Sequence, residues 1–139
     1  MALMGPSACS VLVLLADQWS KRTVLTHAAD RVVAVGPLLK IRFVPHWHNL
    51  DAVAGSRAAL LVTWGLALVS AVILYLFGSW FQGPAALFGL GLAFGGAASN
   101  LLDILWRGYV VDFIDLGWWP VFNLADMAII AGLAMAFLW

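Results

Sequence analysis

Glutamate is absent from this sequence, and charged residues make up only 10% of its 139 residues. A soluble domain carries about a quarter charged residues, so this shortage excludes an ordinary soluble domain. Hydrophobic residues account for 64% of the chain, which predicts an integral membrane protein with one small bundle of spans. Short acidic side chains reach the backbone, so we expect the acids at loops, caps and helix ends. All seven acids are aspartates, at positions 17, 30, 51, 103, 112, 115 and 126.

Cysteine and histidine are also scarce. Cys9 is the only cysteine, so no internal disulfide can form, and the residues before it do not fit a lipid-attachment motif. We expect an ordinary membrane-buried thiol. His46 and His48 would share one face of a strand, but no third metal ligand is close by in the sequence. We therefore expect no metal and no organic cofactor.

Four apolar runs have roughly the length of a membrane span, which is about 20 residues. They cover residues 2–19, 58–80, 84–102 and 121–139. The first run is long enough only if it continues to Trp19 at the membrane interface, and Trp118 and Trp119 mark the interface before the last. In the third run, the spacing of Gly91 and Gly95 predicts a close contact between helices.

The only sizeable polar region, residues 22–56, is expected outside the membrane. Residues 40–44 alternate between polar and apolar, and residues 32–35 are rich in valine, which is typical of two or three short strands. The sequence therefore predicts a single domain, residues 1–139, of the all-α membrane class. Its architecture would be a four-transmembrane-helix bundle with a small surface β-sheet between helices 1 and 2.

Two aspartates in apolar surroundings are the strongest candidates for chemistry. Asp112 lies just before the last apolar run and Asp126 just inside it, and a charge within lipid costs about 2.5–3.5 kcal/mol. Two acids that approach each other form a coupled pair, in which one stays protonated while the other is ionised. An aspartyl protease uses that state to activate water.

Asn123 and Asp126 have the spacing of a helix N-cap and an acid at the third helical position. The free amides and the dipole of a helix N-terminus favour a carboxylate there. Asp112 is therefore the better candidate to hold the proton that the pair shares.

Polar residues from distant parts of the chain are predicted to meet near this pair. Asp17 and Lys21 have the spacing of a helical ion pair, as do Asp103 and Arg107; taken alone, the first reads as a helix-end pair worth about 0.2–0.5 kcal/mol. With four spans, the 17–57 and 103–120 loops fall on one side of the membrane. A functional site explains this convergence better than separate caps. The residues expected there are Asp17, Lys21, Asn49, Asn100, Asp103, Asp112, Asn123 and Asp126.

In these motifs the chain resembles the lipoprotein signal peptidases (signal peptidase II), a family of four-span bacterial aspartyl proteases. The motifs are Asn100-x-x-Asp103, the run GYVVDFID at residues 108–115, and Phe122-Asn123-x-Ala125-Asp126. The resemblance implies that Asp112 and Asp126 are the catalytic dyad. It also implies substrate-binding or supporting positions at Asp17, Lys21, Asn49, Asn100, Asp103 and Asn123.

The resemblance further implies an endopeptidase that removes signal peptides from prolipoproteins by cleaving before a diacylglyceryl-modified cysteine. Its partners would be that prolipoprotein and membrane lipid, with no nucleic acid, and a monomer is favoured. The implied location is the bacterial cytoplasmic (inner) membrane, with the active site at the periplasmic or extracellular face. All seven lysines and arginines lie on the active-site side, which by the positive-inside rule alone would be cytoplasmic. We follow the motifs, because they are more specific than a charge count.

Three positions depart from the family pattern. Asp51 and Ala54 stand where a glycine and an aromatic residue are usual after Asn49, and Ile104 stands where an arginine is usual. Arg107 would replace that cation only if the loop bends back. These departures favour one alternative, a non-catalytic relative that binds signal peptides or lipoproteins. A small four-span transporter is less favoured, because its acid should lie near the middle of a span.

Overall fold

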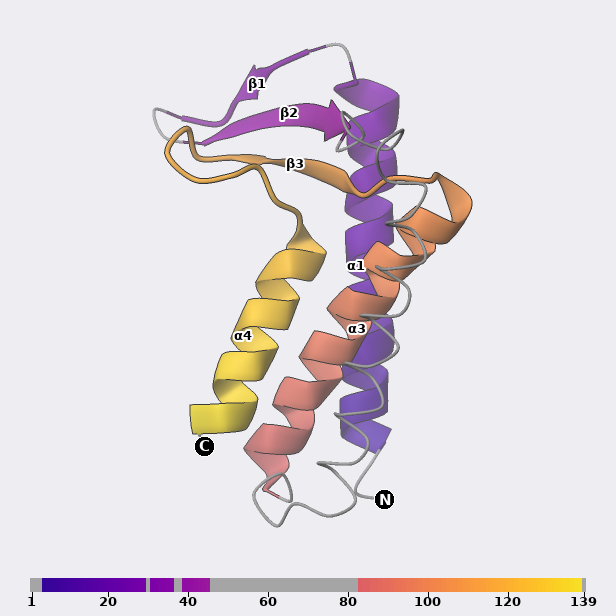
Figure 1. Ribbon diagram of the computed structural model, residues 1–139, viewed down its shortest axis with the longest axis vertical. Helices are drawn as coiled ribbons and strands as arrows, with labels where there is room; N and C mark the ends of the chain where they lie inside the picture. Colours follow the sequence, from indigo (N-terminus) through magenta and orange to yellow (C-terminus); the bar gives the residue numbers. More distant parts are fainter. Residues whose placement is uncertain (1–3, 30, 37–38, 46–82, 139) are drawn as a thin grey trace, which may run out of the picture.

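The computed structural model describes residues 4–29, 31–36, 39–45 and 83–138. Figure 1 shows the described helices side by side, with a small sheet across the end where the first of them stops and the last one starts. The elements in chain order are α1 (Met4–His27), β1 (Val33–Ala34), β2 (Lys40–Pro45), α3 (Pro84–Trp106), β3 (Val111–Asp115) and α4 (Leu124–Leu138).

Three of the four predicted spans correspond to helices α1, α3 and α4. The run at residues 58–80 lies outside the described residues. Among the helices within the described ranges, α3 is the one that is long and apolar enough to cross a membrane, and α4 is apolar but shorter. The structure is thus mostly helical with a small antiparallel sheet.

The first helix is longer than predicted. α1 continues to His27 instead of ending near residue 19, so the region expected to be extramembrane, residues 22–56, is helical over residues 22–27. Asp17 and Lys21 consequently lie within the helix, and both are fully buried. The interpretation of this pair as a helix-end ion pair was therefore wrong, because groups from other helices satisfy the two charges inside the bundle.

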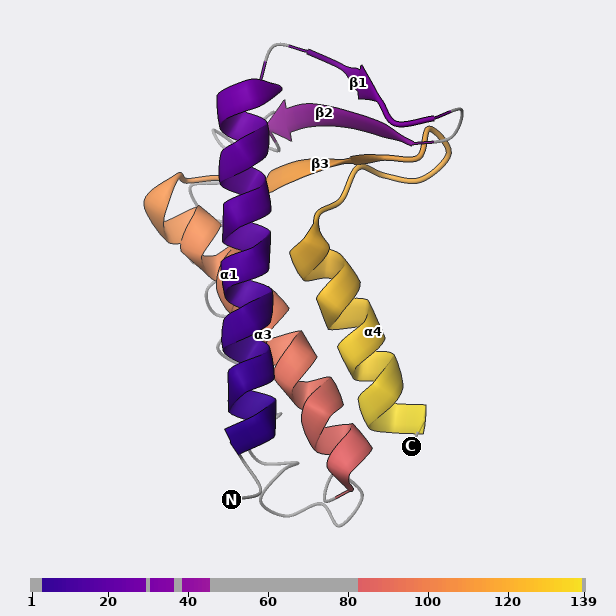
Figure 2. The same cartoon turned by 180° about the vertical axis from the view of Figure 1, so that it is seen from behind.

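Glycines set the distance between the helices. A Cβ atom on Gly96 would lie 2.4 Å from the carbonyl oxygen of Ala125 in α4, and one on Gly91 would lie 2.6 Å from that of Pro6 in α1. Such contacts are too short for real side chains, so α3 approaches both neighbours only because these side chains are absent. The close contact predicted from the Gly91 and Gly95 spacing is confirmed. Figure 2 shows α3 crossing behind α1.

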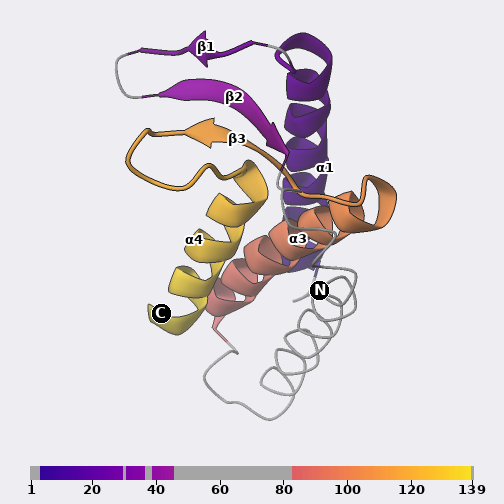
Figure 3. The same cartoon turned by 45° about the horizontal axis from the view of Figure 1, so that its top comes forward.

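The sheet has the order β1-β2-β3, with antiparallel neighbours. The strands predicted near residues 32–35 and 40–44 are confirmed as β1 and β2. β3 was expected to be loop, yet it pairs with β2 along the edge seen in Figure 3, so that Asp112 lies on a strand. Val111 and Phe113 of this strand are buried against Val24 and Ala28, which attaches the sheet to the end of α1.

Candidate active site

Lys21 of α1 is fully buried and connects two acids to an amide. Its Nζ atom lies 2.5 Å from Asp17 Oδ2 and 2.7 Å from Asp103 Oδ2, and it donates a hydrogen bond of 2.8 Å to Asn100 Oδ1. An ammonium group has three N–H donors, so each has an acceptor. Buried charges are tolerated when they are paired and hydrogen-bonded in this way. The pair predicted from the sequence is thus part of a larger buried cluster.

Asp17 also joins α1 to the other two helices. Its Oδ2 atom accepts a hydrogen bond from Ser99 Oγ at 2.7 Å, and its Oδ1 atom accepts one from the backbone N–H of Ala125 at 2.9 Å. That N–H belongs to the first turn of α4, where backbone donors have no partner within the helix. Asp17 therefore fixes the start of α4 against α1.

The start of α4 carries reciprocal capping contacts. Asn123 Oδ1 accepts the backbone N–H of Asp126 at 2.9 Å, and Asp126 Oδ2 accepts the backbone N–H of Asn123 at 3.1 Å. This exchange is the capping-box arrangement, with an acid in the third helical position. The predicted N-cap is confirmed, and it directs the Asp126 carboxylate toward the sheet end of the bundle.

Two asparagine amides hold the two candidate catalytic carboxylates. Asn100 Nδ2 donates to Asp126 Oδ1 at 2.8 Å, and Asn123 Nδ2 donates to Asp112 Oδ1 at 2.8 Å. The amides are themselves linked, because Asn123 Nδ2 also donates to Asn100 Oδ1 at 3.2 Å. The two acids therefore share one hydrogen-bonded frame.

The chain brings Asp112 beside Asn123 by folding back after β3. Phe122 and Ile114 exchange backbone hydrogen bonds of 3.1 and 2.8 Å, which places the next residue, Asn123, near Asp112. Gly117 lies in the turn with φ of 79°, a conformation that favours glycine. This local pairing aligns the end of the strand with the start of α4.

Asp103 is fully buried near the end of α3 and accepts four donors. Lys21 and the backbone N–H of Val111, at 3.2 Å, contact its Oδ2 atom. Gln18 Nε2, at 2.8 Å, and Arg107 Nη1 contact its Oδ1 atom. The predicted pair of Asp103 with Arg107 is confirmed. Sequence reasoning missed Gln18, although an amide directly after Asp17, in a chain so poor in polar groups, is a signal that could have identified it.

Seven of the eight residues predicted to converge belong to this one network. The eighth, Asn49, lies outside the described residues, as do His46, His48, Asp51 and Ala54. Within the described ranges, no group of three or more His, Cys, Asp or Glu side chains is arranged to hold a metal ion.

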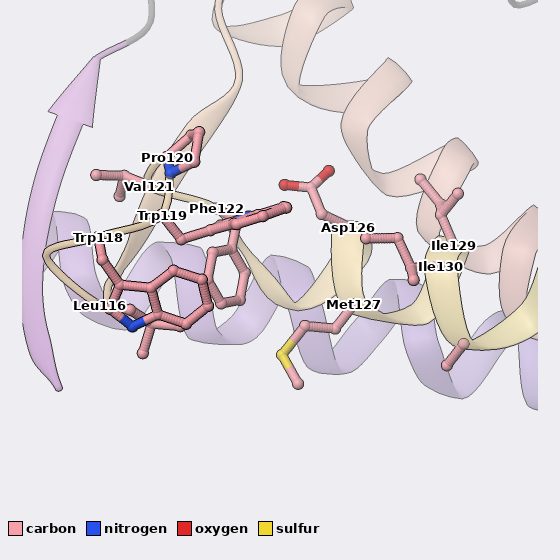
Figure 4. Close-up of a pocket in the computed structure, with 11 residues that line it drawn as sticks. Leu116, Trp118, Trp119, Pro120, Val121, Phe122, Asp126, Met127, Ile129 and Ile130 are labelled. Carbon is pink, nitrogen blue, oxygen red and sulfur yellow. The ribbon is translucent and has the colours of Figure 1, made fainter. Parts of the chain in front are cut away.

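Asp126 also lines an apolar groove of about 740 Å³ between α4 and the segment that precedes it. Figure 4 shows its carboxylate at the first turn of α4, with Trp118 on the preceding segment. Among the described residues that line the groove, Asp126 is the only one with a charged side chain. The remaining lining residues are Leu116, Trp118, Trp119, Pro120, Val121, Phe122, Met127, Ile129, Ile130 and Ala131.

Comparison with known proteins agrees with the motifs. A lipoprotein signal peptidase of Syntrophomonas wolfei is 37% identical over 130 residues, which cover 88% of this chain and 83% of the relative. That of Moorella thermoacetica is 39% identical over 128 residues, with the same shares of 88% and 83%. A solved structure described as a bacterial membrane enzyme has the same fold, with a TM-score of 0.83 at 23% identity, and the match covers 96% of this chain and 90% of that chain.

The family model described as signal peptidase (SPase) II matches residues 9–139, which is most of the chain. The matched range contains Asp17 and Lys21 as well as both candidate catalytic acids, so it includes the whole network described above. The resemblance seen in the sequence motifs is confirmed, and the chain belongs to the signal peptidase II family.

Proposed function

We propose that Asp112 and Asp126 form the catalytic dyad with which this protease removes signal peptides from prolipoproteins. The observation that carries the proposal is the linked pair of amides. Asn100 and Asn123 each donate to one of the two carboxylates and contact each other. Two acids from the consecutive elements β3 and α4 are thus held in one frame at one end of the bundle.

In the proposed reaction the two carboxyl groups share one proton. The ionised group takes a proton from water, the water oxygen attacks the scissile carbonyl carbon, and the protonated group donates a hydrogen bond to the carbonyl oxygen. When the bond between carbon and nitrogen breaks, a protonated carboxyl gives its proton to the leaving amine. Asn100 and Asn123 orient the two groups throughout. These steps require no metal or organic cofactor.

The proposed substrate is a prolipoprotein cut just before a diacylglyceryl-modified cysteine. Its acyl chains would stay in lipid while its signal helix lies among the spans. The groove beside Asp126 supports this substrate, because the other described residues that line it are apolar. Membrane lipid is the second expected partner, nucleic acid is not expected, and the protein would act as a monomer.

The proposed location is the bacterial cytoplasmic (inner) membrane, crossed by four helices. The dyad would lie at the periplasmic or extracellular face. The apolar helices α3 and α4 and the position of the network at one end of the bundle support this arrangement. The fourth helix of the proposal is the apolar run at residues 58–80.

The test is cleavage of a diacylglyceryl-modified prolipoprotein by the purified protein in detergent, followed as a shift on a gel. Asp112→Asn and Asp126→Asn should each lower turnover by more than about a thousandfold, since either removes one member of a catalytic unit. Asp115→Asn makes the same change on the same strand outside the dyad and should retain cleavage. Full activity in either dyad variant would refute the assignment. Binding without cleavage by the wild-type protein would favour the non-catalytic alternative.

A further inference from the structure

Gln18 and Arg107 both contact Asp103, and the family motifs assign a role to neither. We propose that they are positioning residues for the dyad, which act on both catalytic acids through the orientation of Asp103. This inference rests on the proposed function of Asp112 and Asp126. It concerns what holds the two acids in place.

The two oxygen atoms of the Asp103 carboxylate accept from different donors. Arg107 Nη1 and Gln18 Nε2 contact Oδ1, whereas Lys21 Nζ and the backbone N–H of Val111 contact Oδ2. A carboxylate is planar and rigid, so the donors on Oδ1 fix the direction in which Oδ2 points. Gln18 and Arg107 therefore determine where Oδ2 meets its own two donors.

Lys21 and Asn100 connect Asp103 Oδ2 to Asp126. Lys21 bridges Asp103 Oδ2 and Asn100 Oδ1. An asparagine amide can be turned either way round, but the donor on Oδ1 holds it with Nδ2 facing Asp126, at 2.8 Å. Asn123 Nδ2 also donates to this Oδ1 atom, at 3.2 Å, so misplacing Lys21 would remove the shorter of two contacts and loosen the amide.

Val111 connects Asp103 Oδ2 to Asp112. The backbone N–H of Val111 donates to Asp103 Oδ2 at 3.2 Å, and Val111 directly precedes Asp112 on β3. Asp103 therefore has a short route to both members of the dyad. Its orientation affects the two acids together.

Arg107 also balances the charge of the cluster. Asp17 and Asp103 are both fully buried, and Lys21 alone would supply one positive charge for two negative ones. Arg107, with a side chain 22% exposed, supplies the second. Removal of one partner from a buried ion cluster leaves an uncompensated charge, which is costly.

The same contact places a cation beside Asp103 although position 104 is isoleucine. Ile104 is buried, and the cation comes from Arg107 instead. No bend of the loop is required, because α3 continues to Trp106 and Arg107 reaches Asp103 by the spacing of one helical turn. A bend is thus not needed to bring Arg107 to Asp103, and that Arg107 takes over from the missing arginine stays a prediction.

Gln18 keeps Arg107 and Asp103 together. Its Oε1 atom accepts a hydrogen bond from Arg107 Nη1 at 3.0 Å, while its Nε2 atom donates to Asp103 Oδ1 and, at 2.9 Å, to Ser99 Oγ. Ser99 in turn donates to Asp17. The contacts form a closed ring through Asp17, Lys21, Asp103, Gln18 and Ser99, which resists displacement of any one member.

The experiment measures kcat, KM and the thermal unfolding midpoint for prolipoprotein cleavage by variants in detergent. Arg107→Gln should lower kcat by about tenfold to a hundredfold, the effect of a small misplacement of catalytic groups, with KM unchanged because no substrate contact is lost. Arg107→Lys keeps the charge without the planar fork and should recover part of the loss. Arg22→Gln removes the same charge from an exposed position on α1 and should leave kcat unchanged.

Gln18→Leu provides the second variant. It should lower kcat in the same way, and its effect combined with Arg107→Gln should be less than multiplicative, because both act on one oxygen of Asp103. Wild-type kcat in Arg107→Gln and Gln18→Leu, while the wild type cleaves, would overturn this inference and leave the dyad intact. If Arg107→Gln does not fold, Arg107→Lys and Gln18→Leu decide: reduced kcat at an unchanged midpoint supports the inference, and wild-type kcat in both overturns it.

Discussion

Single polar side chains in this protein serve the fold and the site at once. Asn123 uses its Oδ1 atom to cap α4 and its Nδ2 atom to hold Asp112. Lys21 satisfies two buried carboxylates and also fixes the amide of Asn100. In a bundle with so few polar groups, loss of one side chain therefore affects stability and catalysis together, and chemically chosen substitutions are needed to separate the two.

Asn123→Ser and Asn123→Ala separate the two roles of this residue. Serine remains a good N-cap, whereas alanine does not, so the free energy of unfolding should be about 1 kcal/mol lower for the alanine variant. Both variants lose the amide donor to Asp112, so both should lower kcat by roughly tenfold or more. Unfolding in detergent and prolipoprotein cleavage measure the two effects. Wild-type kcat in Asn123→Ser would show that this donor does not orient Asp112.

Elements that are determined by neighbouring residues could be predicted from the sequence. Elements that depend on contacts with distant segments could not. The cap at Asn123 and the strands β1 and β2 have local signals and were predicted. α1 was expected to end near its polar pair at Asp17, because a polar pair normally marks a helix end; the other helices satisfy that pair, so the helix continues. β3 was missed because its partner, β2, is far away in the chain.

Gly96, at the contact between α3 and α4, should contribute as much to stability as a polar residue of the network does. In Gly96→Ala the new Cβ would meet the carbonyl oxygen of Ala125, which directly precedes Asp126. We expect overpacking to cost about 1–3 kcal/mol, against a gain of up to about 1 kcal/mol in helix propensity. The displaced start of α4 should also lower kcat.

The matched control is Gly83→Ala, at the start of α3. Within the described part of the chain, nothing lies within 4 Å of a Cβ atom there. Alanine is a poorer N-cap than glycine, but the φ of −70° at Gly83 suits alanine and the smaller entropy of the unfolded chain offsets the loss, so the free energy of unfolding should change by less than about 0.5 kcal/mol. Denaturation of both variants in the same detergent measures the difference. Equal stability of the two would mean that α3 and α4 can separate without cost, contrary to the packing described here.

At the scale of the whole molecule, the sheet, the polar network and the groove lie at one end of the bundle, as Figures 1 and 3 show for the elements that carry them. The gathering of acids and amides at this end was predicted from the order of the apolar runs. The groove was not, because its walls come from a turn and a helix that are brought together only by the pairing of Phe122 with Ile114.

The burial and pairing of the cations affect the prediction of how the protein is oriented in the membrane. Positive charge on the active-site side favours a cytoplasmic position by the positive-inside rule. However, Lys21 is fully buried between two acids, and Arg107 is paired with Asp103. A count of all seven cations therefore overstates the charge that this face presents to water and lipid head groups, which weakens the argument against the orientation implied by the motifs.

We expect the sheet end to face the periplasm or the cell exterior. Ala29 is exposed just after α1 at that end, and Gly83 precedes α3 at the other. In a Cys9→Ser background, a membrane-impermeant maleimide should label Ala29→Cys on intact spheroplasts and Gly83→Cys only after the membrane is opened. The reverse labelling would place the dyad in the cytoplasm. Because impermeant reagents report only which side a thiol faces, this outcome is independent of whether either variant retains peptidase activity.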